Sequence, residues 1–510
     1  MADNRTKNVV KNSTASILQK LVQIICQFAL RTAFIYLLGN EYTGVSGLFT
    51  DILQVLSLME LGLDSSMIFS LYEPLAKHDS KRISSLLSFY KSAFTVIGIT
   101  VLVAGLICTP FIPRIINGVP NIKEDIRGIF LMYVLTTASS YFLIYKSVLL
   151  RADQKSRIIS KWTSVVLITE CISEIIVLLV LREFYAYLII HFISTIGINI
   201  IISRISAKIY CEYFSYKEAA LLKHEKVKLF KDLACLTVYN FSGVIINSTD
   251  SIFISAFVGT TEVAVIGNFT LIMNGVRAAV SQIVNATKPS IGNLAATSSN
   301  NKQEEIFNRM NFISFWVACF CCNCLFNLMN PFIGDIWFNT SYTISMDIIA
   351  VMVANFFIAV MVFPVESFRT ANGLFVQGWM RPAVMAILNI ILDFILGRQY
   401  GIIGIFLATT VSRLTTQVWY DPWLVYSKVF RKSVTRFYSI YVVYAFITAI
   451  TCLLTYYICK FADVDSVFMS FILKMAASFI IPNTIIVALF RNSEDFRYVS
   501  TLIYKIMKRS

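Results

Sequence analysis

Long runs of apolar residues alternate with short polar segments along almost the whole chain. Each run is close to the roughly 20 residues that a helix needs to cross a bilayer. The pattern predicts an all-α, polytopic membrane protein with 14 transmembrane helices. They are expected at residues 14–37, 44–70, 85–110, 126–148, 158–181, 185–207, 234–258, 263–287, 309–332, 345–368, 380–397, 400–424, 437–459 and 466–490.

Composition supports this interpretation and excludes other classes. The 510 residues are 57% hydrophobic and only 15% charged, against roughly 25% charged in soluble proteins. This excludes a soluble enzyme, a disordered chain and a secreted disulfide scaffold. The net charge of +14 would suggest nucleic acid in a soluble chain. Here the basic residues lie in short loops between apolar runs, so no nucleic-acid partner is expected.

The distribution of basic residues predicts the orientation in the membrane. With the N-terminus inside, inner segments hold about 32 of the 44 Lys and Arg residues and outer loops hold about five. Because cytoplasmic loops are enriched in Lys and Arg, both termini are expected in the cytoplasm, with the chain multi-pass in the cytoplasmic membrane. The outer loops are too short for large catalytic segments, so the chain is not expected to be an enzyme.

Two segments that each join an outward-going helix to an inward-going one resemble each other. Residues 39–50 and 259–270 align without a gap, at an offset of 220 residues or six helices. An even offset predicts a parallel repeat, as in several transporter folds. We therefore expect two six-helix lobes, 1–222 and 223–430, followed by helices 13 and 14 and a cytoplasmic tail in 431–510. The matching pairs are Gly39/Gly259, Val45/Val265, Gly47/Gly267, Phe49/Phe269 and Thr50/Thr270.

Polar residues form stripes at helical spacing on the repeat-related helices 1, 2, 7 and 8. Such stripes can simply bond helices to one another. Charges in the membrane are costly, however, and usually face a cavity or a partner, so we predict a water-filled central cavity. The expected substrate-binding residues are Lys20, Gln27, Arg31, Gln54, Asp64, Asn240, Asn247, Asn274, Arg277, Ser281 and Lys288.

The charge of this predicted cavity indicates its substrate class. Lys20, Arg31, Arg277 and Lys288 are its candidate cations. Arg suits bidentate recognition of phosphate, and Lys acts as a point charge. A cationic cavity rich in amides and hydroxyls favours a phosphorylated sugar over a lipophilic cation.

Three ionisable residues of helices 5 and 6 have simpler interpretations. Glu170 and Glu174 are one turn apart on helix 5. They are expected to meet water or a donor on a neighbouring helix, and a proton relay is the alternative. His191 on helix 6 is expected to be a hydrogen-bonded packing residue.

Five segments stand out along the chain: 60–79, 147–155, 247–255, 288–294 and 419–423. Together they resemble those of a known family, the bacterial oligosaccharide flippases, which form the polysaccharide-transport branch of the multidrug/oligosaccharidyl-lipid/polysaccharide exporter superfamily. The resemblance implies alternating access and a substrate of undecaprenyl-pyrophosphate-linked oligosaccharide repeat units, flipped for capsule or exopolysaccharide biosynthesis. Polysaccharide polymerase and glycosyltransferases are candidate partners beside the lipid bilayer.

A second resemblance, to lipid II flippases of the same superfamily, implies a sodium site in the second lobe. In some of them a carboxylate of helix 7 meets ligands from helices 11 and 12. The matching positions here are Asp250, Asn389, Asp393, Ile405 (through its carbonyl) and Thr409. The coupling ion would be Na⁺ or H⁺, and no other cofactor is expected. The alternative is an ion pair between Asp393 and Arg413.

Two other functions remain open at this stage. A cation-coupled multidrug antiporter would have the same fold, but the four candidate cations of the cavity oppose cationic drugs as substrates. A membrane enzyme of polysaccharide assembly is opposed by the short outer loops. The sequence therefore favours the flippase.

Overall fold

The computed structural model describes residues 2–57, 63–116, 120–215, 243–246, 248–297, 299–372, 374, 378, 380–462 and 464–509. Helices make up nearly all of these residues, and no strand occurs among them. The prediction of an all-α fold is confirmed.

Eleven helices are long and apolar enough to cross a membrane, which makes the chain a multi-pass membrane protein. Each coincides with a predicted span. They lie in α1 (Ala2–Leu37), α4 (Ser80–Cys108) with its continuation to Ile115, α6 (Ile126–Ile144), α8 (Ser156–Val180), α9 (Phe184–Ile209), α12 (Thr260–Thr297), α13 (Asn300–Pro331) with its continuation to Trp337, α14 (Met346–Ala371), α15 (Met380–Tyr400), α18 (Thr435–Cys459) and α19 (Val467–Phe490).

The other three predicted spans are not single long helices among the described residues. The span 44–70 corresponds to α2 (Asn40–Leu56) and α3 (Leu63–Ala76). The span 400–424 is split into α16 (Ile402–Thr415) and α17 (Gln417–Val425), because Thr416 leaves the helical region at φ −123° and ψ −66°. Of the span 234–258, residues 243–246 and 248–258 are described, and all of these except Val258 are helical.

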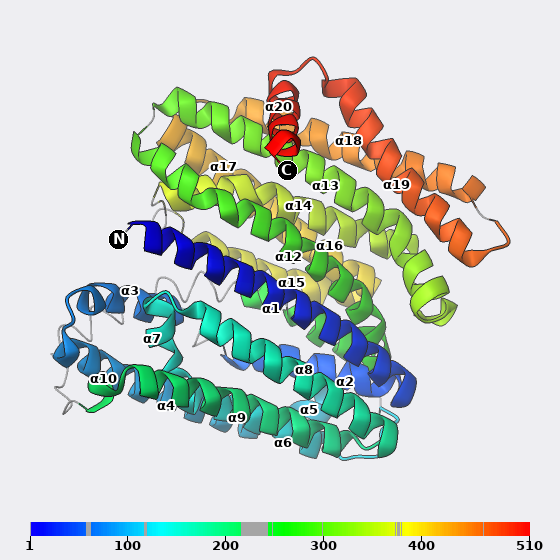
Figure 1. The fold of residues 1–510 in the computed structure, drawn as a ribbon. Coiled ribbons are helices and arrows are strands. Elements are labelled where there is room, and N and C mark those ends of the chain that lie inside the picture. The colour runs from blue at the N-terminus through cyan, green and yellow to red at the C-terminus, as the bar shows by residue number, and fades with distance from the viewer. Residues whose placement is uncertain are drawn as a thin grey trace. The chain divides into compact units, whose positions relative to one another are not determined.

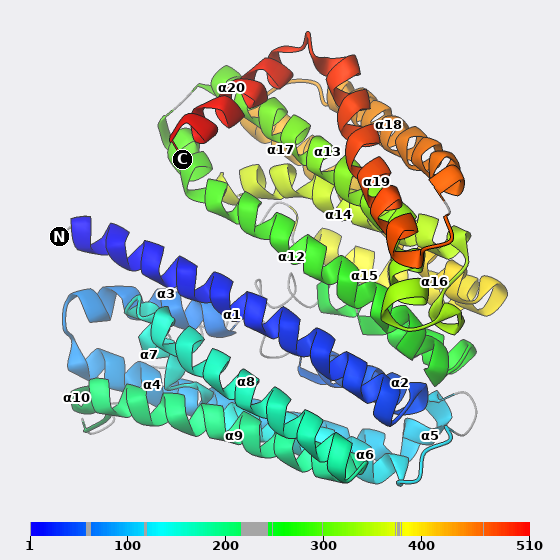
Figure 2. The ribbon, with the colours of Figure 1, turned by 45° about the vertical axis from the view of Figure 1, so that its right-hand side comes forward.

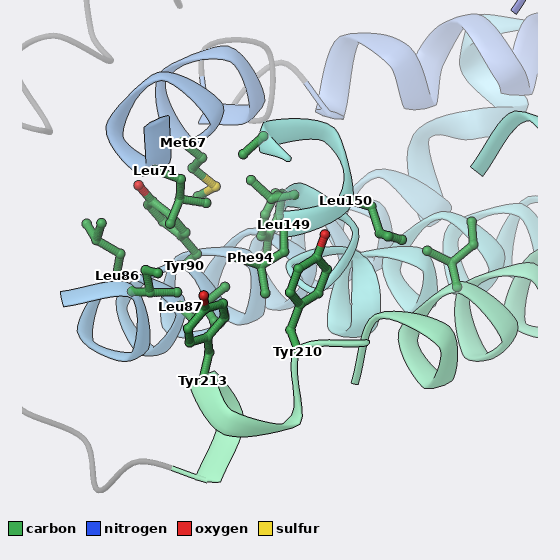
Figure 3. Close-up of a cluster of buried hydrophobic side chains, with 14 of the residues drawn as sticks. Met67, Leu71, Leu86, Leu87, Tyr90, Phe94, Leu149, Leu150, Tyr210 and Tyr213 are labelled. Atoms are coloured by element: carbon green, nitrogen blue, oxygen red, sulfur yellow. The ribbon is translucent and has the colours of Figure 1, made fainter. Parts of the chain in front are cut away.

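The chain folds as two compact units, residues 1–264 and 265–510. In the first unit α1 packs along α8, and α9 packs against both α6 and α8 (Figure 1, Figure 2). One apolar cluster of this unit joins α3 and α4 to the short helices α7 (Ser147–Ala152) and α10 (Cys211–Ser215). Figure 3 shows Met67, Tyr90, Leu149 and Tyr213 converging there.

In the second unit α13 is the central helix and contacts α14, α18, α19 and the terminal helix α20 (Glu494–Arg509). Phe315 of α13 stacks on Tyr444 of α18 at a ring-centroid distance of 3.9 Å. Trp316 donates from Nε1 to Oδ1 of Asn483 at 2.8 Å. The predicted C-terminal segment 431–510 therefore belongs to the core of this unit. The predicted lobe boundary at 222/223 lies outside the described residues.

The two matching segments of the predicted repeat begin with similar turns. Gly39 precedes α2 with φ +96°, and Gly259 precedes α12 with φ +148°. The N–H of Gly39 donates to the Phe34 carbonyl at 3.1 Å, and the N–H of Gly259 donates to the Ile254 carbonyl at 3.0 Å. A positive φ favours glycine. The two turns, 220 residues apart, share a positive φ at glycine and this hydrogen bond, and the parallel repeat stays a prediction.

Candidate functional site

The polar face of α1 lies on the surface of the first unit. Lys20 and Gln27 are exposed, and Lys20 donates from Nζ to Oε1 of Gln23 at 3.0 Å. Arg31 is half-buried and donates from Nη2 to the carbonyl oxygen of Ala264 at 2.6 Å. This face therefore presents cations and amides, and Arg31 also ties α1 to the first turn of α12.

The predicted residues of helices 2 and 7 are only partly described. Gln54 is exposed and accepts from the Ser248 hydroxyl at 3.1 Å. Asp250 is half-buried in the same unit. Asp64 lies in α3, and its side chain is outside the described part of the structure. Asn240 and Asn247 lie outside the described residues. Their predicted roles stay predictions.

The polar face of α12 carries the equivalent residues of the second unit. Asn274 is exposed. Arg277 is half-buried and interacts electrostatically with Glu366 of α14. Ser281 donates to the Ala278 carbonyl of its own helix at 2.8 Å, a local bond typical of a helix interior. The side chain of Lys288 is outside the described part.

Three residues of the predicted sodium site meet between α15 and α16. Asn389 Nδ2 lies 3.3 Å from Asp393 Oδ1 and 3.3 Å from Thr409 Oγ1. Asn389 and Asp393 are fully buried, and so is Ile405, one turn before Thr409. Carboxylate, amide and hydroxyl oxygens are ligands that hard cations prefer. Asp250 belongs to the other unit, and the five-residue ligand set stays a prediction.

The alternative partner of Asp393 has its own contacts. Arg413 Nη1 donates to the carbonyl oxygen of Asn355 on α14 at 3.2 Å. The side chain of Asn355 donates in turn to the Phe406 carbonyl of α16 at 2.9 Å. These bonds link α14 to α16.

The structure also shows a buried charge cluster that the sequence analysis did not predict. Arg369 Nη1 lies 2.9 Å from Asp421 Oδ1, and Arg381 Nη2 lies 3.2 Å from Asp421 Oδ2. All three side chains are at most 6% exposed. Asp421 comes from the segment 419–423, and the two Arg residues stand at the end of α14 and the start of α15. The sequence did hold a signal for this cluster. Asp421 is a carboxylate within an apolar run, and Arg369 and Arg381 lie at the ends of two neighbouring apolar runs.

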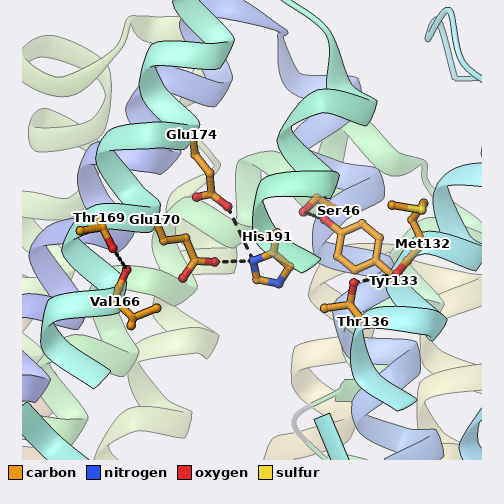
Figure 4. A network of polar contacts seen from close by, with 9 residues as sticks. All are labelled: Ser46, Met132, Tyr133, Thr136, Val166, Thr169, Glu170, Glu174 and His191. Carbon is orange, nitrogen blue, oxygen red and sulfur yellow. Dashed lines mark hydrogen bonds and ion pairs between the residues drawn. The ribbon is translucent and has the colours of Figure 1, made fainter. Parts of the chain in front are cut away.

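Glu170, Glu174 and His191 form a polar cluster in the first unit (Figure 4). His191 Nδ1 lies 2.7 Å from Glu170 Oε1 and 3.6 Å from Glu174 Oε1. The neighbouring-helix donor expected for the two Glu residues is therefore His191. The sequence pattern did not connect the two Glu residues with His191, because no spacing relates residues on different helices.

The chain resembles known proteins in its fold and not in its sequence. No sequence-family profile and no curated protein sequence matches the chain. Among solved structures, lipid II flippase MurJ in an inward closed conformation is similar at a TM-score of 0.63 and 16% identity, over 95% of this chain and 99% of MurJ. A mutant of the MATE transporter VcmN from Vibrio cholerae is similar at a TM-score of 0.59 and 14% identity, over 84% of this chain and 97% of VcmN. An inward-facing multidrug resistance MATE family transporter of the MOP superfamily is similar at a TM-score of 0.55 and 12% identity, over 81% of this chain and 97% of that transporter.

The chain has the fold of these transporters. At such identities the likeness establishes the fold alone. The predicted polytopic helical fold is therefore that of MurJ and the MATE transporters.

Proposed function

We propose that this protein is a flippase that moves undecaprenyl-pyrophosphate-linked oligosaccharide repeat units across the cytoplasmic membrane. In this proposal the head group crosses the membrane by alternating access while the lipid tail stays in the bilayer. The translocated units would serve the assembly of a cell-surface polysaccharide such as a capsule or an exopolysaccharide.

The observation that carries this proposal is the extent of the match to MurJ. The structural match includes 95% of this chain and 99% of the lipid II flippase MurJ. The MATE structures cover 81–84% of the chain, and the uncovered remainder is close in size to the C-terminal segment 431–510. The helices of this segment, α18–α20, pack on α13 as part of the second unit. A lipid-linked substrate therefore fits the whole architecture better than a drug.

A groove of the second unit supports a lipid-tailed substrate. It has a volume of about 370 Å³ and an almost entirely apolar lining. Burial of apolar surface is favourable at about 25 cal/mol per Å², so such a groove suits a polyprenyl chain. It lies between α13, α19 and α20 and is lined by Ile313, Trp316, Val317, Phe320, Phe479, Asn483 and Val499.

The cations of the polar faces support an anionic head group. Lys20 and Arg31 stand on the polar face of α1, and Arg277 stands on the polar face of α12. A planar guanidinium can bind a pyrophosphate oxygen pair in bidentate fashion. The same residues disfavour the cationic substrates of a drug antiporter.

Reconstitution tests the proposal directly. The full-length protein is placed in proteoliposomes with undecaprenyl-pyrophosphate-linked oligosaccharide, and a glycosidase outside the vesicles reports the units that reach the outer leaflet. We expect flipping by the wild type and strong loss in the double variant Arg31→Ala, Arg277→Ala. The matched control, Lys161→Ala with Arg127→Ala, removes the same charge at exposed positions and should flip normally.

The same vesicles distinguish the second candidate function. The MATE structures favour a cation-coupled multidrug antiporter as the alternative. Efflux of a cationic dye driven by a sodium or proton gradient, without flipping of the lipid-linked oligosaccharide, would contradict the flippase and support the antiporter.

A further inference from the structure

Two helices of the first unit bring three metal-ligand side chains to one point. Glu170 and Glu174 lie one turn apart on α8 and point at His191 of α9 (Figure 4). One ligand atom of each residue lies within 4.8 Å of those of the other two. Residues four apart share a helix face, so this convergence is built into two regular helices rather than into a loop.

The cluster carries more negative charge than its described neighbours balance. Glu174 is 2% exposed, and its Oε1 accepts no hydrogen bond from the described residues. That oxygen faces His191 Nδ1 at 3.6 Å. Among the described residues, thiol and phenol groups also interact with the two carboxylates, and they supply no positive charge: Tyr133 of α6, Cys171 of α8 and Tyr187 of α9.

A buried carboxylate without compensation is costly. One protonated imidazole would leave two carboxylates with a net charge of −1. A divalent cation with a neutral imidazole would bring the cluster to zero. A dication would therefore balance these three side chains, and a protonated imidazole with one protonated carboxyl group is the alternative that the experiment below separates from it.

The donor set indicates the kind of dication. One imidazole nitrogen and two carboxylate oxygens suit zinc and related first-row metals, whereas Mg²⁺ and Ca²⁺ prefer oxygen ligands throughout. Zinc binds these ligands at about 2.0–2.2 Å, which requires ligand atoms within roughly 4 Å of one another. The ligand atoms of this cluster lie within 4.8 Å of one another, close to that distance.

We propose that Glu170, Glu174 and His191 form a binding site for Zn²⁺ or a first-row metal of similar ligand preference. Nδ1 is the imidazole ligand, because it is the ring nitrogen that faces both carboxylates. Tyr187 stacks on the His191 ring at a centroid distance of 6.3 Å and an interplanar angle of 7°, which holds the ring in this orientation. Such supporting contacts orient metal ligands.

Access to the site comes from the side of His191. Its side chain is 38% exposed, while Glu170 is 13% exposed and Glu174 2%. Three protein ligands with one accessible side leave a fourth position for water, as in open zinc sites. The inference is independent of the transported substrate.

Metal binding by the purified full-length protein tests the site. The metal-free protein is titrated with Zn²⁺ by calorimetry and with Co²⁺ by visible absorption. We expect one Co²⁺ per chain that is lost in His191→Gln and weakened at least about tenfold in Glu174→Gln. The matched control is Glu183→Gln, which removes an exposed carboxylate just before α9. It should bind like the wild type.

The spectrum also separates this site from the cysteines of the chain. Nitrogen and oxygen ligation gives no thiolate-to-cobalt charge-transfer band, whereas binding to cysteine does. A thiolate band, binding unchanged in His191→Gln, or no binding by the folded wild type would each overturn the proposal. If no metal binds, protons on His191 and on one of the two Glu residues would balance the charge of the cluster instead. If Glu174→Gln does not fold, Glu170→Gln takes its place, because Glu170 is less buried.

Discussion

Gly44 of α2 lies directly against the backbone of Thr260, the first residue of α12. A Cβ at position 44 would collide with the carbonyl oxygen of Thr260. One turn earlier, Glu41 accepts hydrogen bonds from the hydroxyls of Thr260 at 3.1 Å and Thr261 at 3.0 Å. Thus the two repeat-related turns of the first unit contact each other, and this close approach requires glycine at position 44.

We expect Gly44→Ala to destabilise the protein, because overpacking of a tight contact costs about 1–3 kcal/mol. The measurement is the thermal unfolding midpoint in detergent. Gly47→Ala is the control, since its Cβ would meet only Val263 Cγ1 at 3.8 Å, an ordinary van der Waals distance. Equal midpoints for Gly44→Ala and the wild type would show that the contact does not persist in solution.

Labelling tests the predicted orientation. Lys155 follows α7 on the predicted cytoplasmic side, and Lys123 precedes α6 on the predicted outer side. On a Cys-free background we expect an impermeant thiol reagent to label Lys123→Cys in intact cells and Lys155→Cys only after lysis. The opposite pattern would reverse the topology derived from the basic residues.

The buried cluster around Asp421 is expected to stabilise the fold rather than to bind substrate. Asp421→Ala leaves Arg369 and Arg381 buried without their carboxylate, a change that typically costs about 3–5 kcal/mol. We expect a large drop in the thermal unfolding midpoint, and little change for Asp335→Asn, which alters an exposed carboxylate of the same unit. An unaltered midpoint for Asp421→Ala would mean that the ion pairs contribute no net stability.

Arg31 has both a structural bond and a predicted contact with substrate. Loss of a charge-assisted hydrogen bond costs roughly 1.5–3 kcal/mol, so Arg31→Ala should reduce flipping at least about tenfold. Arg31→Lys should restore only part, because the planar fork is lost. If the Ala264 bond alone matters, Arg31→Ala will lower the unfolding midpoint while the KM for the lipid-linked substrate stays unchanged.

Local pattern predicted most of the helices because length and hydropathy act within one segment. The break at Thr416 was not predicted, since a single non-helical residue leaves the hydrophobic pattern of 400–424 intact. The resemblance between residues 39–50 and 259–270 was visible because Gly39 and Gly259 occupy turns with a positive φ.

Side-chain partners across helices were harder to predict. Asn389 and Asp393 could be paired from their spacing on one helix, and their approach to Thr409 came from a resemblance. The contacts of His191 with Glu170, and of Asp421 with two Arg residues, depend on how helices rotate against one another. No spacing within one segment encodes that rotation.

The last prediction concerns coupling to an ion. Asn389, Asp393 and Thr409 meet in the buried interior of the second unit, with distances of 3.3 Å from the Asn389 amide to each of the other two side chains. A bound cation biases a transport equilibrium only if its affinity differs between the conformations. We therefore expect an imposed sodium or pH gradient to change the flipping rate of the wild type, and Asp393→Asn to abolish that dependence. Asp335→Asn should keep it. If the wild type ignores both gradients and Asp393→Asn flips equally well, the three residues serve only to pack α15 against α16.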